Sequence, residues 1–259
     1  MGRRACELLE RFPDESPWHL FVSFVGPHDP WDPPTEFADH FRQAPMPDPI
    51  ADSLRNKPNW QHQKAKRQGG ATLEDIRAVR RQYTAALELI DAQVGAILQT
   101  LERKGQLHNT YIIYCSDHGE MLGDHGLFQK SIHYEPALRV PLIVAGPNIK
   151  PGRSAAQIEL SDVHPTLLAL ADIPLASQLD AQSFQHLLGD PTQEHRTDTV
   201  SQLLHCRALR NSEWKLVENY NDTTELYNLH DDPHELHNLA ERHPDIVARM
   251  RRRLVQRLL

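Results

Sequence analysis

The feature that most constrains the fold is a long amphipathic pattern in the middle of the 259-residue chain. Between residues 74 and 102, apolar side chains recur at steps of three and four, which places them on one face of an α-helix. The members of this stripe are Ile76, Val79, Tyr83, Leu87, Ile90, Val94, Ile97 and Leu101. Thr72 followed by Asp75 is typical of a helix start, and Gly105 stands where a glycine often follows the last turn. One helix is therefore predicted over 74–102.

Apolar runs rich in β-branched and aromatic residues occur on both sides of this helix. They cover residues 19–25, 110–116 and 140–146 and predict strands, the first of them buried. A strand, a helix and a further strand at this spacing indicate a layered α/β domain. Shorter helices are expected at 3–11 and at 162–171, the second entered through Asp162 or the His164-Pro165 turn.

The region from residue 26 to about 70 contains seven prolines between Pro30 and Pro58 and ends in two glycines. This composition predicts a long irregular segment, which in a compact domain is usually functional or mobile.

The pattern of expected secondary structure changes past about residue 195. Short strand-like pieces at 199–204, 213–220 and 224–229 are followed by a helical pattern from about residue 243. We therefore expect two domains. Residues 1–194 would form the α/β core and residues 195–259 a small α+β subdomain.

Composition narrows the class of protein. The chain has 28 Lys and Arg against 35 Asp and Glu, a net charge of −7, which argues against nucleic acid as a partner. No run approaches the roughly 18 apolar residues that span a membrane. Glu7 and Glu10 interrupt any apolar stretch near the N-terminus, so no secretory signal is expected. Cys6, Cys115 and Cys206 do not suggest a disulfide framework, and a cytoplasmic location is expected.

The segment that carries the chemistry follows the expected strand at 110–116. Asp117 and His118 stand at the carboxyl end of that strand, where ligands gather in open α/β sheets. A carboxylate oxygen and an imidazole nitrogen are both competent ligands of a divalent cation. Lys130 could fold back as a positive charge toward an anionic substrate. The alternative is structural, with Asp117 capping a turn, His118 satisfying a carbonyl and Lys130 solvated.

Four motifs in order resemble the sulfatases of the alkaline phosphatase superfamily. SDHGEMLGDHGLFQK, followed by YEPALRVPLIVAGP, is similar to the C-terminal half of the sulfatases, and FVSFVGPHDPWDPP is similar to the family's strand and His-x-Pro loop. YTAALELIDAQVGAILQTLERKGQLHNTYIIYCSDHG is similar to its long helix and metal strand, and ELYNLHDDPHELHNLAER to the motif near its C-terminus. The resemblance implies an alkaline-phosphatase-like sulfatase core, incomplete at its N-terminus, with a small C-terminal α+β subdomain.

The resemblance also implies roles for four residues. Asp117 and His118 match ligands of the divalent metal, commonly Ca²⁺, with Mg²⁺ or Mn²⁺ as alternatives. Lys130 matches a lysine that contacts the sulfate oxygens, and His28 a histidine that assists the leaving alkoxide. This set is physically coherent, because a cation, an ammonium and an imidazolium each answer negative charge that develops during the reaction. For His28 alone, a structural role is the competing interpretation.

The family's nucleophile is a cysteine in Cys-x-Pro/Ala-x-Arg that is oxidised to formylglycine, and we do not find it in this chain. Cys206-Arg207-Ala208-Leu209-Arg210 fits the letters of the motif, but it follows the metal motif and belongs to the C-terminal subdomain pattern. The chain is therefore expected to be a fragment that needs an N-terminal half for turnover. The missing N-terminal half should also contribute strands to the central sheet. Without these strands, the sheet of this chain should expose unpaired edges that favour association, so a homo-oligomer is the other expected partner.

The expected function is hydrolysis of a small-molecule sulfate ester by an arylsulfatase-like enzyme. Two alternatives stay open. One is hydrolysis of phosphonate monoesters or phosphodiesters by the same superfamily, and the other is a non-catalytic remnant that acts in binding or assembly.

Overall fold

The computed structural model describes residues 1–175 and 179–258. Residues 176–178, inside the expected core, and Leu259, the last residue of the expected subdomain, lie outside the described residues. The chain forms two compact units. The first unit comprises Met1–Pro49 and Gly70–Thr110, and the second Ile50–Gly69 and Tyr111–Leu259. The domain boundary expected near residue 195 stays a prediction.

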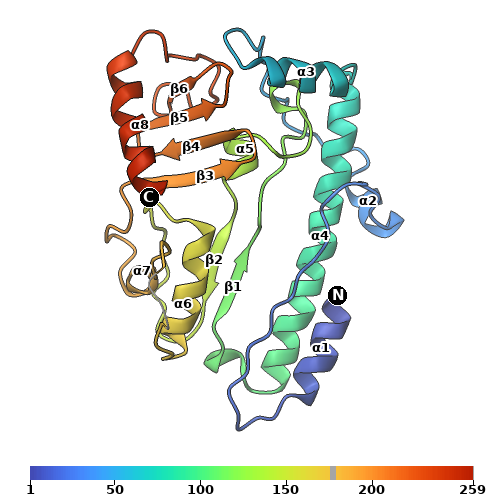
Figure 1. Ribbon diagram of the computed structural model, residues 1–259. Coiled ribbons are helices and arrows are strands. Elements are labelled where there is room, and N and C mark those ends of the chain that lie inside the picture. Colours follow the sequence, from blue (N-terminus) through green and yellow to red (C-terminus); the bar gives the residue numbers. More distant parts are fainter. Residues whose placement is uncertain (176–178, 259) are drawn as a thin grey trace. The chain divides into compact units, whose positions relative to one another are not determined.

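The first unit is built on the predicted long helix, α4 (Leu73–Arg103). Figure 1 shows α1 (Gly2–Arg11) and α2 (Thr35–Phe41) lying against it. The helix begins with a reciprocal cap, in which the Thr72 side chain accepts from Asp75 N and the Asp75 carboxylate accepts from Thr72 N. After α4, Gly105 has φ +66°, the left-handed conformation that favours glycine. A short 3₁₀ helix, η1 (Leu107–Asn109), ends the unit, and the prediction for α4 and its caps is confirmed.

The predicted strand at 19–25 is wrong for the described part of the chain. The chain runs extended here, in the blue stretch after α1 in Figure 1, and its residues alternate between half-buried and exposed. It pairs with no strand among the described residues. Phe21 is 81% exposed and Val25 is 78% exposed, so the segment is not buried either. A strand exists only through hydrogen bonds to a neighbour, and an apolar run cannot by itself supply that neighbour.

The region 26–70 is not wholly irregular. It contains α2 in the first unit and α3 (Asn59–Gln68) in the second. Each helix follows a proline, Pro34 and Pro58, whose fixed φ suits the start of a helix. Both helices are short and mostly polar, so their sequences contain no apolar stripe from which a helix could be predicted.

In the second unit, β1 (Ile112–Cys115) and β2 (Leu142–Ala145) confirm two predicted strands. They pair antiparallel, with Ile113 opposite Val144. The loop between them contains η2 (Asp124–Gly126) and α5 (Glu135–Leu138). After β2 come η3 (Leu160–Asp162), the predicted helix α6 (Val163–Leu170), which begins after Asp162, and α7 (Gln185–Gly189).

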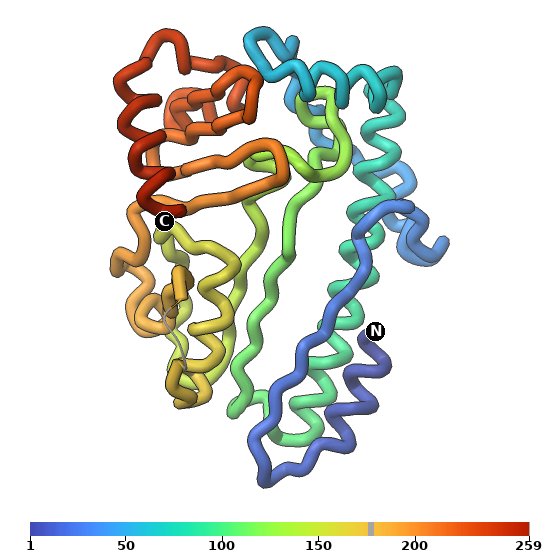
Figure 2. Tube along the Cα trace, in the orientation of Figure 1, coloured from blue at the N-terminus to red at the C-terminus, as the bar shows by residue number. Residues whose placement is uncertain are grey.

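The C-terminal part of this unit is a four-stranded antiparallel meander with one helix. Its strands are β3 (Thr199–Leu203), β4 (Cys206–Arg210), β5 (Trp214–Asn219) and β6 (Glu225–Asn228). Figure 1 shows the four strands with α8 (Pro244–Leu258) running beside them, and the trace in Figure 2 follows the same path from orange to red. The core between sheet and helix consists of Leu209, Trp214, Leu216, Leu226, Val247, Met250 and Leu254. The sequence predicted every element here except β4.

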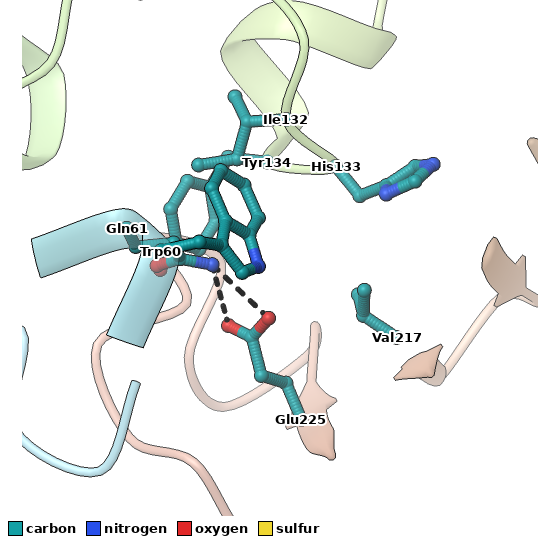
Figure 3. A pocket seen from close by; sticks show the side chains of 7 residues that line it. All are labelled: Trp60, Gln61, Ile132, His133, Tyr134, Val217 and Glu225. Carbon is teal, nitrogen blue, oxygen red and sulfur yellow. Dashed lines mark hydrogen bonds between the residues drawn. The ribbon is translucent and has the colours of Figure 1, made fainter. Parts of the chain in front are cut away.

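Buried polar contacts fasten α3 to this meander within the second unit. The Gln61 side chain donates to both carboxylate oxygens of Glu225, at 3.1 and 3.2 Å (Figure 3). Trp60 Nε1 donates to Asn219 Oδ1 at 3.0 Å. Lys57, two residues before α3, donates from Nζ to the Tyr227 hydroxyl at 2.7 Å. The space drawn in Figure 3 is too small for a water molecule, so it is a packed junction rather than a binding site. It is lined by Trp60, Gln61, Ile132, His133, Tyr134, Val217 and Glu225.

Among the helices of residues 1–175 and 179–258, none combines the length and the apolar character needed to cross a bilayer.

Candidate active site

Asp117 and His118 lie two and three residues after the end of β1, where the chain leaves the sheet. Asp117 Oδ2 is 3.6 Å from His118 Nε2, and the two side chains are 85% and 36% exposed. The other carboxylate oxygen of Asp117 accepts from the His118 backbone N–H at 3.0 Å. The structure therefore places these two predicted ligands next to each other on the surface of the second unit.

The tautomer of His118 follows from its other ring nitrogen. Nδ1 lies 2.8 Å from the carbonyl oxygen of Gly119, and a carbonyl only accepts, so Nδ1 carries the proton and donates. In the neutral ring the lone pair is then on Nε2, the atom that faces Asp117. A metal-binding histidine is held by the same kind of second hydrogen bond, which fixes the ring and leaves one nitrogen for the ion.

These two atoms fit a divalent cation as a partial ligand set. Two ligands about 2.3 Å from one ion stand about 3–4.6 Å apart, and the observed 3.6 Å falls in this range. Ca²⁺ takes about six to eight ligands, so this pair alone is incomplete. Within the part of the chain that the structure describes, no group of three or more His, Cys, Asp or Glu side chains could hold a metal ion.

The loop after His118 is clamped onto α5 by its backbone. Gly119 N donates to Ala137 O at 2.8 Å, and Glu120 N donates to Pro136 O at 3.1 Å. A Cβ added to Gly119 would overlap the Pro136 carbonyl, so only glycine allows this approach. The clamp gives the Asp117–His118 pair a fixed base.

Lys130 lies in the loop between η2 and α5, between two residues with left-handed backbone. Gln129 has φ +66° and Ser131 has φ +70°, conformations that are unfavourable for residues with a Cβ. Two contacts hold them. Gln129 N donates to a carboxylate oxygen of Glu120, and Lys64 Nζ donates to the Lys130 carbonyl. The loop around Lys130 is therefore held in a costly conformation by side chains, as is common at functional sites.

His28 belongs to the first unit and follows the extended segment 19–25. Its Nδ1 lies 2.7 Å from the Asp29 carbonyl oxygen, to which it donates, and 3.2 Å from Asp29 Oδ1. Its side chain is 44% exposed. Asp117, His118 and Lys130 all belong to the second unit. That the four residues surround one hollow stays a prediction.

The sequence reasoning did not single out Lys64, Arg67 or Glu120, which lie around Lys130. Lys64 and Arg67 are spaced three residues apart on α3, and this basic pair was the sequence signal from which their role could have been predicted.

The Cys206 motif is part of the buried meander. Cys206 lies in β4, is 0% exposed, and has its Sγ 3.3 Å from His133 Nδ1. Burial and the nearby Glu225 carboxylate raise the pKa of the Cys206 thiol to about 12. A thiol in this position suits packing and not nucleophilic attack, which agrees with the interpretation from the sequence.

Comparisons with known proteins cover the chain from end to end. The family model described as Sulfatase matches residues 4–173, and the model described as N-sulphoglucosamine sulphohydrolase, C-terminal, matches residues 123–258. A choline-sulfatase of Rhizobium meliloti (strain 1021) is 35% identical over 93% of this chain and 50% of its own length. An arylsulfatase of Clostridium perfringens (strain 13 / Type A) is 31% identical over 78% of this chain and 42% of its own. The chain thus spans about half the length of these relatives.

Two solved structures are similar in fold. The protein BT4656, in complex with its substrate D-glucosamine-2-N,6-O-disulfate, has a TM-score of 0.87 at 22% identity, over 98% of this chain and 68% of that one. A phosphonate monoester hydrolase of Agrobacterium radiobacter has a TM-score of 0.84 at 22% identity, over 99% of this chain and 59% of that one. At this identity the likeness shows the α/β fold alone.

Proposed function

The chain belongs to the sulfatase family of the alkaline phosphatase superfamily, and from this premise we propose that it is the metal- and sulfate-binding part of a sulfuric ester hydrolase. Its relatives are named sulfatases, and the family generally uses a divalent metal and acts on small sulfate esters. The observation that carries the proposal is the pair formed by Asp117 and His118, with the His118 lone pair facing the carboxylate.

We assign the metal to this pair, with Ca²⁺ as the first candidate and Mg²⁺ or Mn²⁺ as alternatives. A bound divalent cation supplies positive charge against the anionic group that is transferred. Asp117 offers a carboxylate oxygen, the ligand type that Ca²⁺ prefers, and His118 offers a nitrogen. The remaining ligands would come from a segment that completes the protein.

Lys130 and His28 complete the proposed chemistry. The Lys130 ammonium would hold the sulfate oxygens, since sulfate is an anion with several acceptors. When the bond between sulfur and the ester oxygen breaks, charge develops on that oxygen, and His28 would donate a proton to it. The nucleophile that attacks sulfur is not among the residues we assign. We therefore expect turnover only when a second polypeptide segment or protein supplies it.

Two features support such a partner. The chain spans about half of the relatives that it matches, and its extended segment 19–25 exposes Phe21 and Val25. An added strand could pair with this segment, as could a second copy of the chain. We propose a cytoplasmic location, because the three cysteines are free thiols and Cys115 is exposed.

The activity is tested with a chimera that joins the N-terminal half of the choline-sulfatase relative to this chain, treated with a formylglycine-generating enzyme. We expect hydrolysis of an aryl sulfate in preference to an aryl phosphonate monoester, and loss of activity in the Lys130→Ala chimera. The reverse preference would favour the phosphonate alternative, and a folded chimera without activity on either ester would favour a non-catalytic remnant. If the chimera does not fold, titration of the chain itself with Ca²⁺ still tests the metal pair.

A further inference from the structure

A hollow of about 360 Å³ opens beside Lys130, entirely within the second unit. Three of its lining residues carry a cationic group, Lys64, Arg67 and Lys130, and a fourth, His205, carries an imidazole. Trp60 forms part of the same wall. Trp60, Lys64 and Arg67 are spaced four and three residues apart on α3, so one face of this helix lines the hollow.

The positive groups around the hollow influence one another. Burial lowers the pKa of Lys64, the carboxylate of Glu120 partly opposes this, and the charge of Lys130 lowers the pKa further. Two ammonium groups that repel each other next to an open space are stabilised when an anion enters that space. The charge of the hollow thus favours an anionic ligand and disfavours a cationic one.

The cations also have hydrogen-bond donors left for a ligand. An ammonium has three N–H donors, and Lys64 uses one of them on the Lys130 carbonyl. The Arg67 guanidinium donates from Nε to the Gln63 carbonyl at 3.3 Å, and its two terminal nitrogens make no hydrogen bond to another of the described residues. Those two nitrogens can bind two oxygens of a sulfate or a carboxylate side by side.

The Trp60 ring adds an apolar wall in a fixed position. Its Nε1 donates to Asn219 Oδ1 at 3.0 Å, and its ring meets His205 edge-on, with 4.7 Å between centroids and 77° between planes. The positive charges of Lys64, Arg67 and Lys130 disfavour an alkyl cation here, and the flat face of Trp60 can pack against a ring-shaped organic group that carries negative substituents.

We propose that this hollow binds a second anionic substituent on the organic part of the substrate, while Lys130 faces the sulfate group that is cleaved. The inference rests on the proposed function, because Lys130 is the residue common to both. It assigns the substrate to sulfated sugars that carry another sulfate or a carboxylate, and it assigns Lys64 and Arg67 as residues that determine this specificity.

Binding to the chain itself tests the inference without any turnover. We would titrate the chain by calorimetry at low salt with a hexosamine that carries one sulfate, with the same sugar carrying two, and with a hexuronate that carries one. The disulfated sugar should bind about five- to tenfold more tightly than the monosulfated one, and added salt should reduce the difference. The hexuronate shows whether a carboxylate can replace the second sulfate.

The key variant is Arg67→Gln, because Arg67 is exposed and its replacement should leave folding intact. It should remove most of the preference for the disulfated sugar. Lys66→Gln removes the same charge from an exposed position of α3 that does not line the hollow, and it should leave the preference unchanged. Lys64→Gln should also remove the preference, but it releases the Lys130 carbonyl as well, so it is the secondary variant.

Equal affinity for the two sugars would overturn the inference, as would an unchanged preference in Arg67→Gln. Tighter binding of an alkyl sulfate with a quaternary ammonium group would also overturn it. None of these results would affect the proposed function, which is tested by Ca²⁺ binding at Asp117 and by ester hydrolysis in the chimera. Conversely, a chimera without activity would leave the binding preference measurable.

Discussion

Oδ2 of Asp117 lies 3.6 Å from Nε2 of His118, and neither atom can donate to the other while the imidazole is neutral. The ring proton is on Nδ1, which the Gly119 carbonyl holds at 2.8 Å. Two acceptors that face each other in this way repel weakly, and a cation between them would satisfy both. This relationship is the strongest structural support for a metal at the end of β1.

Asp117→Ala should therefore weaken Ca²⁺ binding by about tenfold or more, since it removes the only carboxylate of the pair. Because Asp117 is 85% exposed, the free energy of unfolding should change by less than about 0.5 kcal/mol. Calorimetric titration with Ca²⁺, with Mg²⁺ and Mn²⁺ in parallel, measures the first effect. Asp91→Ala, an exposed carboxylate on α4, is the matched control. Identical heats for the wild-type chain and Asp117→Ala would exclude Asp117 as a ligand.

Gly119→Ala should lower the free energy of unfolding by about 1–3 kcal/mol, because the new Cβ would overlap the Pro136 carbonyl. Gly95→Ala is the matched control. Gly95 lies within α4, and no atom of residues 1–175 and 179–258 would come within 4 Å of an added Cβ, so alanine there should stabilise by about 0.5–1 kcal/mol. Urea unfolding of both variants checks the pair. An unaltered stability in Gly119→Ala would mean that the loop after His118 is not clamped onto α5.

The sequence predicted elements whose signal is local and periodic. Ile76, Ile90 and Leu101 are buried members of the α4 stripe, and the Thr72–Asp75 cap formed as expected. The proximity of Asp117 and His118 could also be predicted, because the two residues are adjacent in the sequence.

Contacts between distant parts of the chain could not be predicted in this way. The position of α3 depends on Gln61 bonding to Glu225, which is 164 residues away in sequence. Lys64 reaches Lys130 across 66 residues, so the hollow beside Lys130 has no sequence signature. The segment 19–25 failed for a related reason, since an apolar run does not reveal whether a strand is present to pair with it.

The stability of the second unit should fall as the pH decreases from about 6.5 to 4, in part because of His133. Burial, the Lys215 charge and the nearby His205 lower the pKa of His133 from 6.5 to about 4. Between these values the unfolded chain binds a proton that the folded chain does not, so unfolding becomes easier as the pH falls. The shift corresponds to roughly 3 kcal/mol at most.

The measurement is urea unfolding at a series of pH values. His133→Gln should show a weaker decline than the wild-type chain over this range, even if it is less stable at every pH. His205→Gln, which changes an exposed histidine in the same region, should retain most of the wild-type decline. Parallel curves for wild type and His133→Gln would show that His133 does not contribute.

Cys206 should not react with thiol reagents in the folded protein. It is 0% exposed and its pKa is raised to about 12, so almost no thiolate is present at neutral pH. Cys115 is exposed and should react, although burial of its thiol and the Asp117 charge raise its pKa and slow the reaction. Mass spectrometry after alkylation at pH 7.5 measures this, and all three cysteines should react in denaturant. Labelling of Cys206 in the native protein at the rate of Cys115 would contradict its burial in β4.

The extended segment 19–25 should promote self-association of the chain. Phe21 is 81% exposed and Val25 is 78% exposed, next to backbone groups that pair with no strand in residues 1–175 and 179–258. An edge of this kind is a template for another strand, and a charged residue on it blocks pairing. Phe21→Lys should therefore shift the chain toward monomer at a given concentration, with a change of less than about 0.5 kcal/mol in unfolding free energy. Sedimentation velocity over a range of concentrations measures the shift.

Glu15→Lys, an exposed charge change in the same unit but outside the segment, is the control. Equal association in wild type and Phe21→Lys would mean that the segment is not the contact surface, and support for a pairing partner at 19–25 would be lost.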